Sequence, residues 1–269
     1  MSDAICSVFK PVTVAPSRVT GITEIKPCEA LAPYVRCFWE CGNKNIERDL
    51  RIIPDCCADI IIPLCGDGSA ANFVGVCDKS FISHNAEKIF GIRFYGWAVN
   101  MFFNGALRNY VNASIPVNDV FTDFGRTERS IVTANNIRER VSVAEEYLTG
   151  KLCGLRSNSD VLNALYYALI NDCKVGVSEM AMYCAASRRT LEREFNEFCG
   201  SSPKRLIDMF RYQLLWQACG RSDFDVLDCV ERFGFYDCAH LYNNFKKFHG
   251  IGIAEALTEL RNLSQIYNT

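Results

Sequence analysis

The side chains best suited to a defined chemistry stand on a predicted helix that begins after Ser187. Its exposed face is predicted to carry Arg188, Arg189, Glu192, Arg193 and Asn196. Arg189 and Arg193 are four residues apart, so they lie on one face of the helix. Arginine forms bidentate hydrogen bonds with guanine edges in a DNA groove, and it also holds phosphates and fixes register. The helix therefore suits contact with a nucleic acid, although an arginine-rich face can also be simply solvated.

This helix belongs to an internal repeat. "VSEMAMYCAASRRTLEREFNEFCG" (177–200) aligns with "VLDCVERFGFYDCAHLYNNFKKFHG" (226–250), and the second copy has one additional residue in its turn. Each copy predicts a short helix, a tight turn and a second helix that Ser187 or Asp237 can N-cap. The second helices share a predicted buried stripe at i, i+4 and i+7, formed by Leu191, Phe195 and Phe198 and by Leu241, Phe245 and Phe248.

A long helix is predicted to join the two copies. Pro203 suits its first position, and the helix should run to about Cys219. Asp225 can cap the first helix of the second copy. The pattern predicts two helix-turn-helix units bridged by one helix.

Residues 158 to about 257 resemble the DNA-binding domain of AraC-family transcription regulators. The motifs that carry the resemblance are Ser187-Arg188-Arg189-Thr190-Leu191, Phe195 with Gly200-Ser201-Ser202-Pro203, Arg211, Gly234-Phe235 and Phe245-Lys246-Lys247. The resemblance implies two recognition helices that enter successive major grooves of double-stranded DNA. It places base contacts at Arg189 and Arg193 in the first unit. In the second unit it places them at Cys238, Ala239 and Asn243, with His240 and Asn244 close by.

The second recognition helix lacks long polar side chains at these positions. With Ala239 and Cys238 at these positions, we expect only a contact with a thymine methyl group and one contact from Asn243. Lys246 and Lys247 can still hold phosphate. Residues 158–269 also carry 12 Lys+Arg against 14 Asp+Glu, whereas such domains are usually basic. Fewer neutralised phosphates mean lower non-specific affinity. We therefore expect DNA binding that depends on the first unit, on dimerisation, or on both.

The first 125 residues predict strands rather than helices. "YVRCFWEC", "ADIIIPL", "NFVGVC" and "IFGIRFY" are β-branched or aromatic runs between turn residues, typical of a small antiparallel barrel or sandwich. The expected fold class is α+β, with a β-rich sensor domain (1–125), a helical dimerisation or linker region (126–157) and a DNA-binding domain (158–269). Helices are expected at 97–104 and 131–152. The second of these is the candidate dimer contact, although it could equally pack inside the monomer.

Part of this β-rich region resembles an N-terminal sensor domain that is fused to some regulators of the same family. The resemblance covers residues 31–39, 53–60 and 91–94, and the family pattern has glycine where this chain has Cys56. Cys56 and Cys57 are thereby adjacent thiols at a turn. Vicinal cysteines rarely bond to each other without strain, so a soft metal, an oxidant or a thiol-reactive ligand would be their stimulus. The alternative is that they are small buried hydrophobic residues.

Aromatic residues in the sensor region could line a ligand pocket. They are Phe38, Trp39, Phe94, Tyr95, Trp97, Phe102 and Phe103. A small apolar or aromatic effector would suit such a lining, although the same residues could form the core.

The composition limits the other classes of function. The 269 residues are 49% apolar and 22% charged, as in folded globular proteins. With no signal peptide and no apolar run long enough for a bilayer, a cytoplasmic protein is expected, and 15 cysteines then do not indicate disulfides. Three histidines and no C-x-x-C pair predict no metal site and no cofactor.

An enzyme is a weaker interpretation of this sequence. No Gly-rich phosphate loop, G-x-S-x-G or H-E-x-x-H motif occurs. A cysteine-dependent DNA-repair alkyltransferase can carry an AraC-like domain, but the clustered cysteine ligands of such enzymes are absent. The sequence predicts a homodimeric regulator of promoter DNA that responds to a small ligand or a thiol-reactive signal, with RNA polymerase as a candidate partner and activation favoured by family habit. The alternative is a regulator that acts mainly through a partner protein and binds DNA weakly.

Overall fold

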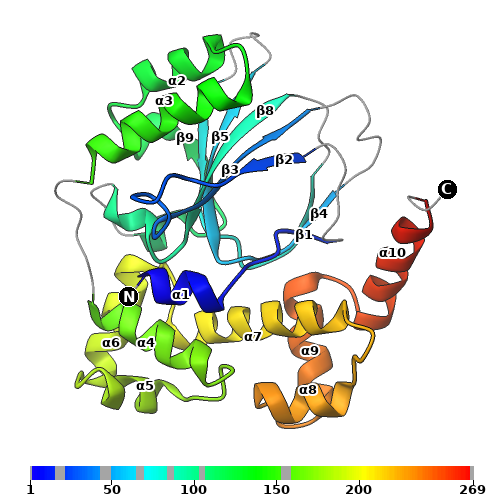
Figure 1. Cartoon of the computed structure of the whole chain (residues 1–269). Helices are drawn as coiled ribbons and strands as arrows, with labels where there is room; N and C mark the ends of the chain where they lie inside the picture. The colour runs from blue at the N-terminus through cyan, green and yellow to red at the C-terminus, as the bar shows by residue number, and fades with distance from the viewer. Residues whose placement is uncertain are drawn as a thin grey trace.

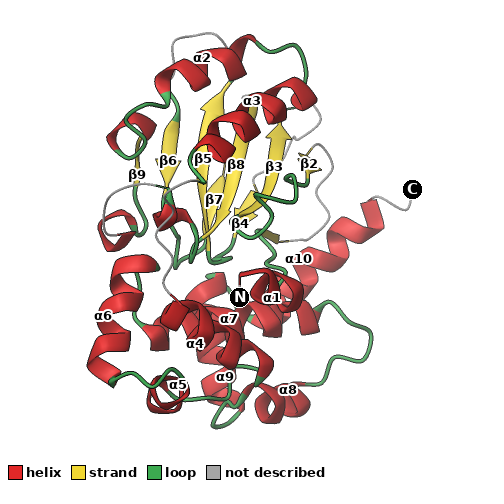
Figure 2. Ribbon diagram, turned by 60° about the vertical axis from the view of Figure 1, so that its left-hand side comes forward, coloured by secondary structure: helices red, strands yellow, loops and turns green. Residues whose placement is uncertain are grey.

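The computed structural model describes residues 2–15, 22–42, 50–64, 70–83, 88–102, 107–152 and 159–266. An antiparallel β domain lies on an all-helical domain that holds the C-terminal half of the chain (Figure 1). Two helices, α2 (Gly125–Thr133) and α3 (Ile137–Gly150), pack on the sheet on the side away from the helical domain (Figure 2). The expected α+β fold is confirmed.

Two antiparallel sheets form the β domain. The larger has the order β2-β3-β8-β5-β6-β9, and the smaller has the order β1-β4-β7. The strands of the larger sheet are β2 (Ile22–Ile25), β3 (Val35–Cys41), β5 (Cys57–Pro63), β6 (Asn72–Val74), β8 (Ile89–Tyr95) and β9 (Ser114–Pro116). Those of the smaller sheet are β1 (Val14–Ala15), β4 (Leu50–Ile52) and β7 (Phe81–Ser83). The four runs singled out in the sequence form β3, β5, β6 and β8.

The two faces of the larger sheet have different chemistry because side chains alternate along a strand. Phe38 stacks on Phe90, with ring centroids 6.3 Å apart, on the face that forms the apolar core. Trp39 points to the opposite face, toward the smaller sheet. It lies flat against Gly91, where a Cβ atom would come within 2.0 Å of the indole ring. Glycine is therefore required at this position of β8.

The helix predicted at 131–152 is wrong in its extent, and its apolar residues follow the alternative that it packs inside the monomer. The chain forms α2 and α3 with a break between them, because the Asn136 side chain accepts hydrogen bonds from the backbone N–H groups of Arg138 and Glu139 and starts a new helix. Val141, Ala144 and Leu148 of α3 are buried in the monomer core. The apolar face predicted for dimerisation is therefore already covered.

The helix predicted at 97–104 is also shorter than expected. Only η1 (Val99–Met101) forms, as a 3₁₀ turn with hydrogen bonds between residues three apart. Phe103 and Asn104 lie outside the described residues. Two further 3₁₀ turns follow, η2 (Leu107–Tyr110) and η3 (Val117–Asp119).

The helical domain follows the prediction closely. Its helices are α4 (Ser159–Ile170), α5 (Val177–Tyr183), α6 (Arg188–Phe198), α7 (Pro203–Cys219), α8 (Val226–Phe233), α9 (Cys238–His249) and α10 (Ile253–Ile266). Pro203 is the first residue of α7, and the Ser202 hydroxyl caps it by accepting from the Arg205 N–H. Within the described ranges, no helix combines the length and the apolar character needed to span a bilayer.

The first helix of the chain does not belong to the β domain. Helix α1 (Ser2–Val8) packs on α4, and the Phe9 ring that follows lies 4.5 Å from Phe210 of α7. Both Ile5 and Phe9 are fully buried there. The predicted boundary at residues 1–125 is therefore wrong for this segment, because its apolar side chains find their partners in the helical domain.

A buried glutamine on α7 joins the two domains. The Gln213 Oε1 atom accepts from the Val12 N–H at 2.8 Å, and its Nε2 donates to the carbonyls of Val12 at 2.8 Å and Pro54 at 2.5 Å. Gln213 is completely buried. The helix that bridges the two helix-turn-helix units is thus hydrogen-bonded to two segments of the β domain.

The end of α9 makes a second contact between the domains. The Ser80 hydroxyl donates to the His249 carbonyl at 2.7 Å. The buried His249 ring stacks on Phe245 with centroids 4.6 Å apart, and its Nδ1 lies 2.9 Å from the Tyr212 hydroxyl. Burial, with a smaller effect of the Arg51 charge, lowers the pKa of His249 to about 3.

This lowered pKa predicts an acid sensitivity that arises at His249. The unfolded chain takes up a proton on this side chain near pH 6.5, whereas the folded chain keeps the imidazole neutral until about pH 3. Stability is therefore lost as the pH falls through this window. When unfolding in urea is measured between pH 7.5 and 4, the free energy of unfolding should decrease less in H249F than in the wild-type protein, by roughly 1 kcal/mol or more. Equal slopes in H249F and the wild-type protein would contradict the assignment.

Candidate nucleic-acid interface

The first helix-turn-helix unit is formed by α5 and α6. The Ser187 hydroxyl caps α6 by accepting from the Thr190 N–H at 3.0 Å. In the turn, Ala185 has a φ of 51°, and the Ala186 N–H donates to the Ala181 carbonyl at 2.9 Å. Leu191 and Phe195 are fully buried, as the repeated stripe predicted. The unit therefore has a fixed turn and a well-anchored second helix.

The outer face of α6 presents the predicted arginines to solvent. Arg188 is paired with Glu192, with 2.9 Å between Nε and Oε1. Arg193 is 71% exposed and lies 3.6 Å from a carboxylate oxygen of Glu194. Arg189 is exposed and has no ion pair among the described side chains. Surface pairs of this kind are weak, so Arg193 can exchange its pair for contacts with a ligand, and Arg189 can make such contacts directly.

The remaining polar residues of the first unit have local roles. Asn196 is half-buried and donates its side-chain N–H to the Glu192 carbonyl at 2.7 Å. Ser187 is exposed, but its hydroxyl is engaged in capping.

The second unit, α8 and α9, repeats the first with one change in the turn. Gly234 has a φ of 67°, and the Phe235 N–H donates to the Val230 carbonyl at 3.0 Å, which matches the Ala186–Ala181 bond. The additional residue is therefore Tyr236, which stands between this bond and the cap. Its side chain is 90% exposed.

Asp237 and His240 form the start of α9. The Asp237 carboxylate accepts from the His240 N–H at 2.7 Å. The His240 Nδ1 accepts from the Tyr236 N–H at 3.2 Å, and its ring meets Phe235 edge to face at 5.4 Å. Both predicted DNA contacts are thus engaged within the protein, although both side chains are exposed.

The exposed face of α9 carries few groups that could read bases. Ala239, Asn243, Lys246 and Lys247 are exposed, and Cys238 is half-buried. The Lys247 Nζ lies 4.9 Å from the centre of the Phe248 ring. The prediction for Asn244 is wrong: its side chain is 7% exposed, on the inner side of the helix. An asparagine next to an exposed asparagine cannot share its face, because successive residues are about 100° apart around a helix.

Apolar side chains around the second unit were missed in the sequence. Leu227 in the first turn of α8 is 68% exposed and Tyr242 on α9 is 47% exposed, in addition to Tyr236. The additional residue in the turn was the one available signal. The first unit also exposes apolar side chains, Met182 and Tyr183 at the end of α5, so exposed apolar groups are common to both units.

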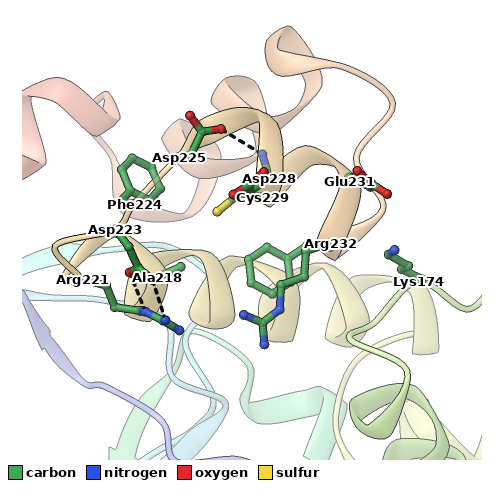
Figure 3. Close-up of a pocket in the computed structure, with 11 residues that line it drawn as sticks. Lys174, Ala218, Arg221, Asp223, Phe224, Asp225, Asp228, Cys229, Glu231 and Arg232 are labelled. Carbon is green, nitrogen blue, oxygen red and sulfur yellow. Dashed lines mark hydrogen bonds and ion pairs between the residues drawn. The ribbon is translucent and has the colours of Figure 1, made fainter.

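Acidic residues of the helical domain gather away from both recognition helices. A surface cavity of about 390 Å³ lies between the end of α7 and α8 (Figure 3). It is lined by four carboxylates, Asp223, Asp225, Asp228 and Glu231, and by the cations Lys174, Arg221 and Arg232. Arg221 is paired with Asp223 at 2.8 Å, and Asp225 caps α8. The excess of acid disfavours phosphate here, so this cavity is not part of the nucleic-acid face.

The predicted ligand-binding aromatic residues do not form one pocket. Phe38 and Phe94 are fully buried in the core on one face of the larger sheet. Tyr95 stacks on Trp97 at 4.7 Å, and Trp97 meets Phe210 of α7 at 5.9 Å, so this pair lies at the domain interface. Trp39 lies on the face toward the smaller sheet and, among the predicted residues that the structure describes, it lines the cavity there.

A small polar cavity lies between the two sheets, beside Trp39. Its volume is about 120 Å³. Arg93 forms a bidentate ion pair with Asp59, with Nε–Oδ1 and Nη2–Oδ2 distances of 3.0 Å. The Trp39 Nε1 also donates to Asp59, at 3.0 Å. Thr13 accepts from Arg93 and donates to Asp55, both at 2.5 Å. These residues come from four separate segments of the chain, and no motif along the sequence connects the four.

The adjacent thiols at the turn point in different directions. Cys57 lines the cavity between the sheets, whereas Cys56 is buried toward Cys173 and Cys199 of the helical domain. Burial, with the nearby Asp55 charge, raises the pKa of both thiols well above the usual range. No three metal-binding side chains come together in the part of the chain that the structure describes. The geometry thus favours the interpretation of Cys56 and Cys57 as buried small residues over a sensor.

The sequence matches two domain families. Residues 180–258 match a helix-turn-helix domain, HTH_18, and residues 23–116 match a domain of unknown function, DUF6597. The C-terminal part of this chain is therefore an AraC-type helix-turn-helix domain, a DNA-binding domain of transcription regulators. It is joined to an N-terminal domain of the DUF6597 type. A comparison with curated proteins found no match.

Among solved structures, the chain is similar to ToxT from Vibrio cholerae. An apo variant of ToxT is 11% identical, with a TM-score of 0.40 over 89% of this chain and 96% of that one. Wild-type ToxT with a bound unsaturated fatty acid is 14% identical, with a TM-score of 0.37 over 88% and 93%. These low scores mean that the function of this chain has to be inferred from its own residues.

The burial of the two turn thiols predicts low reactivity. In the folded, reduced protein at neutral pH, Cys56 and Cys57 should react with a disulfide reagent only at the rate at which the chain unfolds, because the thiolate is the attacking form. Half-exposed Cys238 is the internal control and should be labelled first. Peptide mapping by mass spectrometry gives the order, and labelling of Cys56 as fast as Cys238 would restore the thiol-sensor hypothesis.

Proposed function

We propose that this chain is a sequence-specific transcription regulator that binds promoter DNA mainly through α6 and responds to a small ligand in its N-terminal domain. The observation that carries the proposal is the exposure of Arg189 and Arg193 on one face of a capped and anchored recognition helix. Both side chains can reach base edges or phosphates in a major groove.

The second unit contributes less to base recognition in this proposal. Its α9 face offers Ala239 and Asn243, with Lys246 and Lys247 near the helix end for phosphate. An alanine can contact a thymine methyl group, and an asparagine can bind adenine. Asp237 and His240 are already engaged in the turn. The unit therefore positions the domain on the duplex more than it selects sequence.

The domain interface supports a response to a ligand. Gln213 connects α7 to Val12 and Pro54, whose neighbours Thr13 and Asp55 line the cavity between the sheets. A change at the cavity can thus reach the helix that carries both recognition units. The response is assigned to a small ligand rather than to thiol chemistry, because Cys56 and Cys57 are buried.

The arginines of α6 give the most direct test. R189A and R193A should each weaken binding to the DNA upstream of the protein's own gene by about 1–3 kcal/mol if they contact bases. R221A is a matched control, because Arg221 is also an exposed arginine in a surface pair but lies in the loop after α7. Fluorescence anisotropy with specific and scrambled DNA separates base contacts from phosphate contacts. Unchanged specific affinity in both variants would contradict the proposal.

The small number of exposed cations on the recognition helices predicts a weak salt dependence. Each phosphate neutralised contributes about −0.9 to the slope of log K against log salt concentration. We expect a shallow slope per monomer, reduced further by about 2 in a K246A/K247A variant if each of these lysines holds one phosphate. A steep slope that this variant leaves unchanged would place the phosphate contacts elsewhere.

A second candidate is a regulator that acts mainly through a partner protein. The exposed side chains of Tyr236 in the turn and Tyr242 on α9 favour it, because exposed aromatic side chains are enriched at protein contacts. It predicts that a Y236S/Y242S variant loses regulation while keeping its DNA affinity.

A further inference from the structure

The cavity between the two sheets has an unbalanced charge. Among its described lining residues, one guanidinium group, that of Arg93, faces two carboxylates, those of Asp55 and Asp59. Arg93 is committed to Asp59 through a bidentate pair, and its nearest approach to Asp55 is 3.8 Å, between Nη1 and Oδ2. All three side chains are at most 13% exposed. The site therefore holds one more negative than positive charge in a confined space.

Neutral groups donate the hydrogen bonds to the Asp55 carboxylate, and the ion pair with Arg93 at 3.8 Å is shared with Asp59. Its Oδ2 accepts from the Thr13 hydroxyl and its Oδ1 accepts from the Cys57 N–H at 2.9 Å. A buried carboxylate that has only neutral donors at hydrogen-bonding distance remains costly, because its charge is not neutralised. Asp55 is thus the group that a positive ligand would complete.

The surroundings of the cavity confirm the sign of its field. The Cys77 thiol lines the same cavity. Burial raises its pKa to about 12, and the charges of Asp55, Asp59 and Asp78 all act in the same direction. Asp78 forms an ion pair with Arg205, so Asp55 and Asp59 are the carboxylates that face the cavity.

The size and the walls of the cavity limit the ligand. A volume of about 120 Å³ corresponds to about four water molecules at roughly 30 Å³ each. Apolar side chains complete the lining, among them Ile52, Ile61 and Phe81. A ligand of this size with a charged head and a short hydrocarbon tail matches both parts of the lining.

We propose that this cavity is the effector site and that it takes a small organic cation, an alkylammonium head bound at Asp55 with its tail against Ile52, Ile61 and Phe81. The inference rests on the proposed function in that the bound ligand is taken to act on the DNA-binding domain. The path from the cavity to the DNA-binding domain is short, because Gln213 of α7 is hydrogen-bonded to the peptide groups of Val12 and Pro54. These two residues directly precede Thr13 and Asp55, which line the cavity.

Binding is tested on the full chain with three probes of equal length. Butylammonium, butyrate and 1-butanol differ in charge but share the hydrocarbon tail. We expect a saturable rise in Tm and a calorimetric binding isotherm with butylammonium, and neither with the other two. D55N should weaken butylammonium binding by about tenfold or more, the loss expected for a hydrogen bond to a charged group. D223N removes an exposed carboxylate outside the cavity and should leave the affinity unchanged.

A second variant keeps the test decisive if D55N does not fold. C77L adds volume to the cavity lining without changing Asp55, Asp59 or Arg93, and it should also abolish binding. The proposal would be overturned if the folded wild-type chain did not bind butylammonium or bound butyrate more tightly. It would also be overturned if both D55N and C77L kept full affinity for butylammonium.

Measurement of DNA affinity separates this inference from the proposed function. With a butylammonium-loaded protein, DNA affinity should change, and Q213M should keep ligand binding but lose the change. If the wild-type protein binds DNA specifically but not butylammonium, the cavity assignment fails alone. If it binds butylammonium at Asp55 but no DNA in either state, the regulator proposal fails and the cavity assignment stands.

Discussion

The buried amide of Gln213 is the interaction on which the arrangement of this protein depends. It lies in the middle of α7 and makes three hydrogen bonds to backbone groups of the β domain. An apolar residue in its place would leave these backbone groups without partners, at a cost of about 1–3 kcal/mol for each buried group. Because α7 also bridges the two helix-turn-helix units, this one side chain fixes the DNA-binding domain relative to the β domain.

The need to bury several faces of α7 explains much of the surrounding structure. Phe210 packs against Phe9 and Trp97 from the N-terminal part of the chain. Tyr212 contacts Phe248 and His249 of α9. A helix in an isolated DNA-binding domain would present a part of this surface to water. Here the two domains share a continuous apolar core, so a shift of one domain against the other has to repack side chains.

The turn from Pro54 to Cys57 links the interface to the interior of the β domain. The Pro54 carbonyl contacts α7, Asp55 faces the cavity, Cys56 is buried against the helical domain and Cys57 begins β5. Cys56 adopts a left-handed conformation, with φ of 60°, that a glycine would adopt without strain. This conformation suits the glycine that the resemblance to a sensor domain implies at this position, and the Cys56 side chain that stands there in this chain is buried.

The two helix-turn-helix units have the same scaffold and different surfaces. Their turns share a left-handed residue and a matching backbone hydrogen bond, at Ala185 and Gly234. The first unit keeps arginines on its outer face, whereas the second exposes Tyr236, Ala239 and Tyr242. The scaffold is conserved within the repeat because burial requires it, while the outer face is unconstrained by folding and has diverged.

Local patterns in the sequence determined the elements of both domains. The caps at Ser187, Asp225 and Asp237, the start of α7 at Pro203 and the buried stripe at Leu191 and Phe195 depend on neighbours within one or two turns, so they could be predicted. The same holds for the solvent exposure of Arg189 and Arg193. The break at Asn136 is local too, but it was hidden by an apolar pattern that continues across it.

Only the tertiary structure decided which distant residues meet. The cavity brings together Thr13, Asp55, Asp59 and Arg93 from separate segments, and no spacing along the chain encodes that meeting. The exclusion of Asn244 from the surface, the placement of α1 on α4 and the role of Gln213 also depend on packing between elements. The spacing of apolar residues along a helix or strand and the capping of a helix depend on a short stretch of chain. Burial and charge pairing depend on the assembled interior.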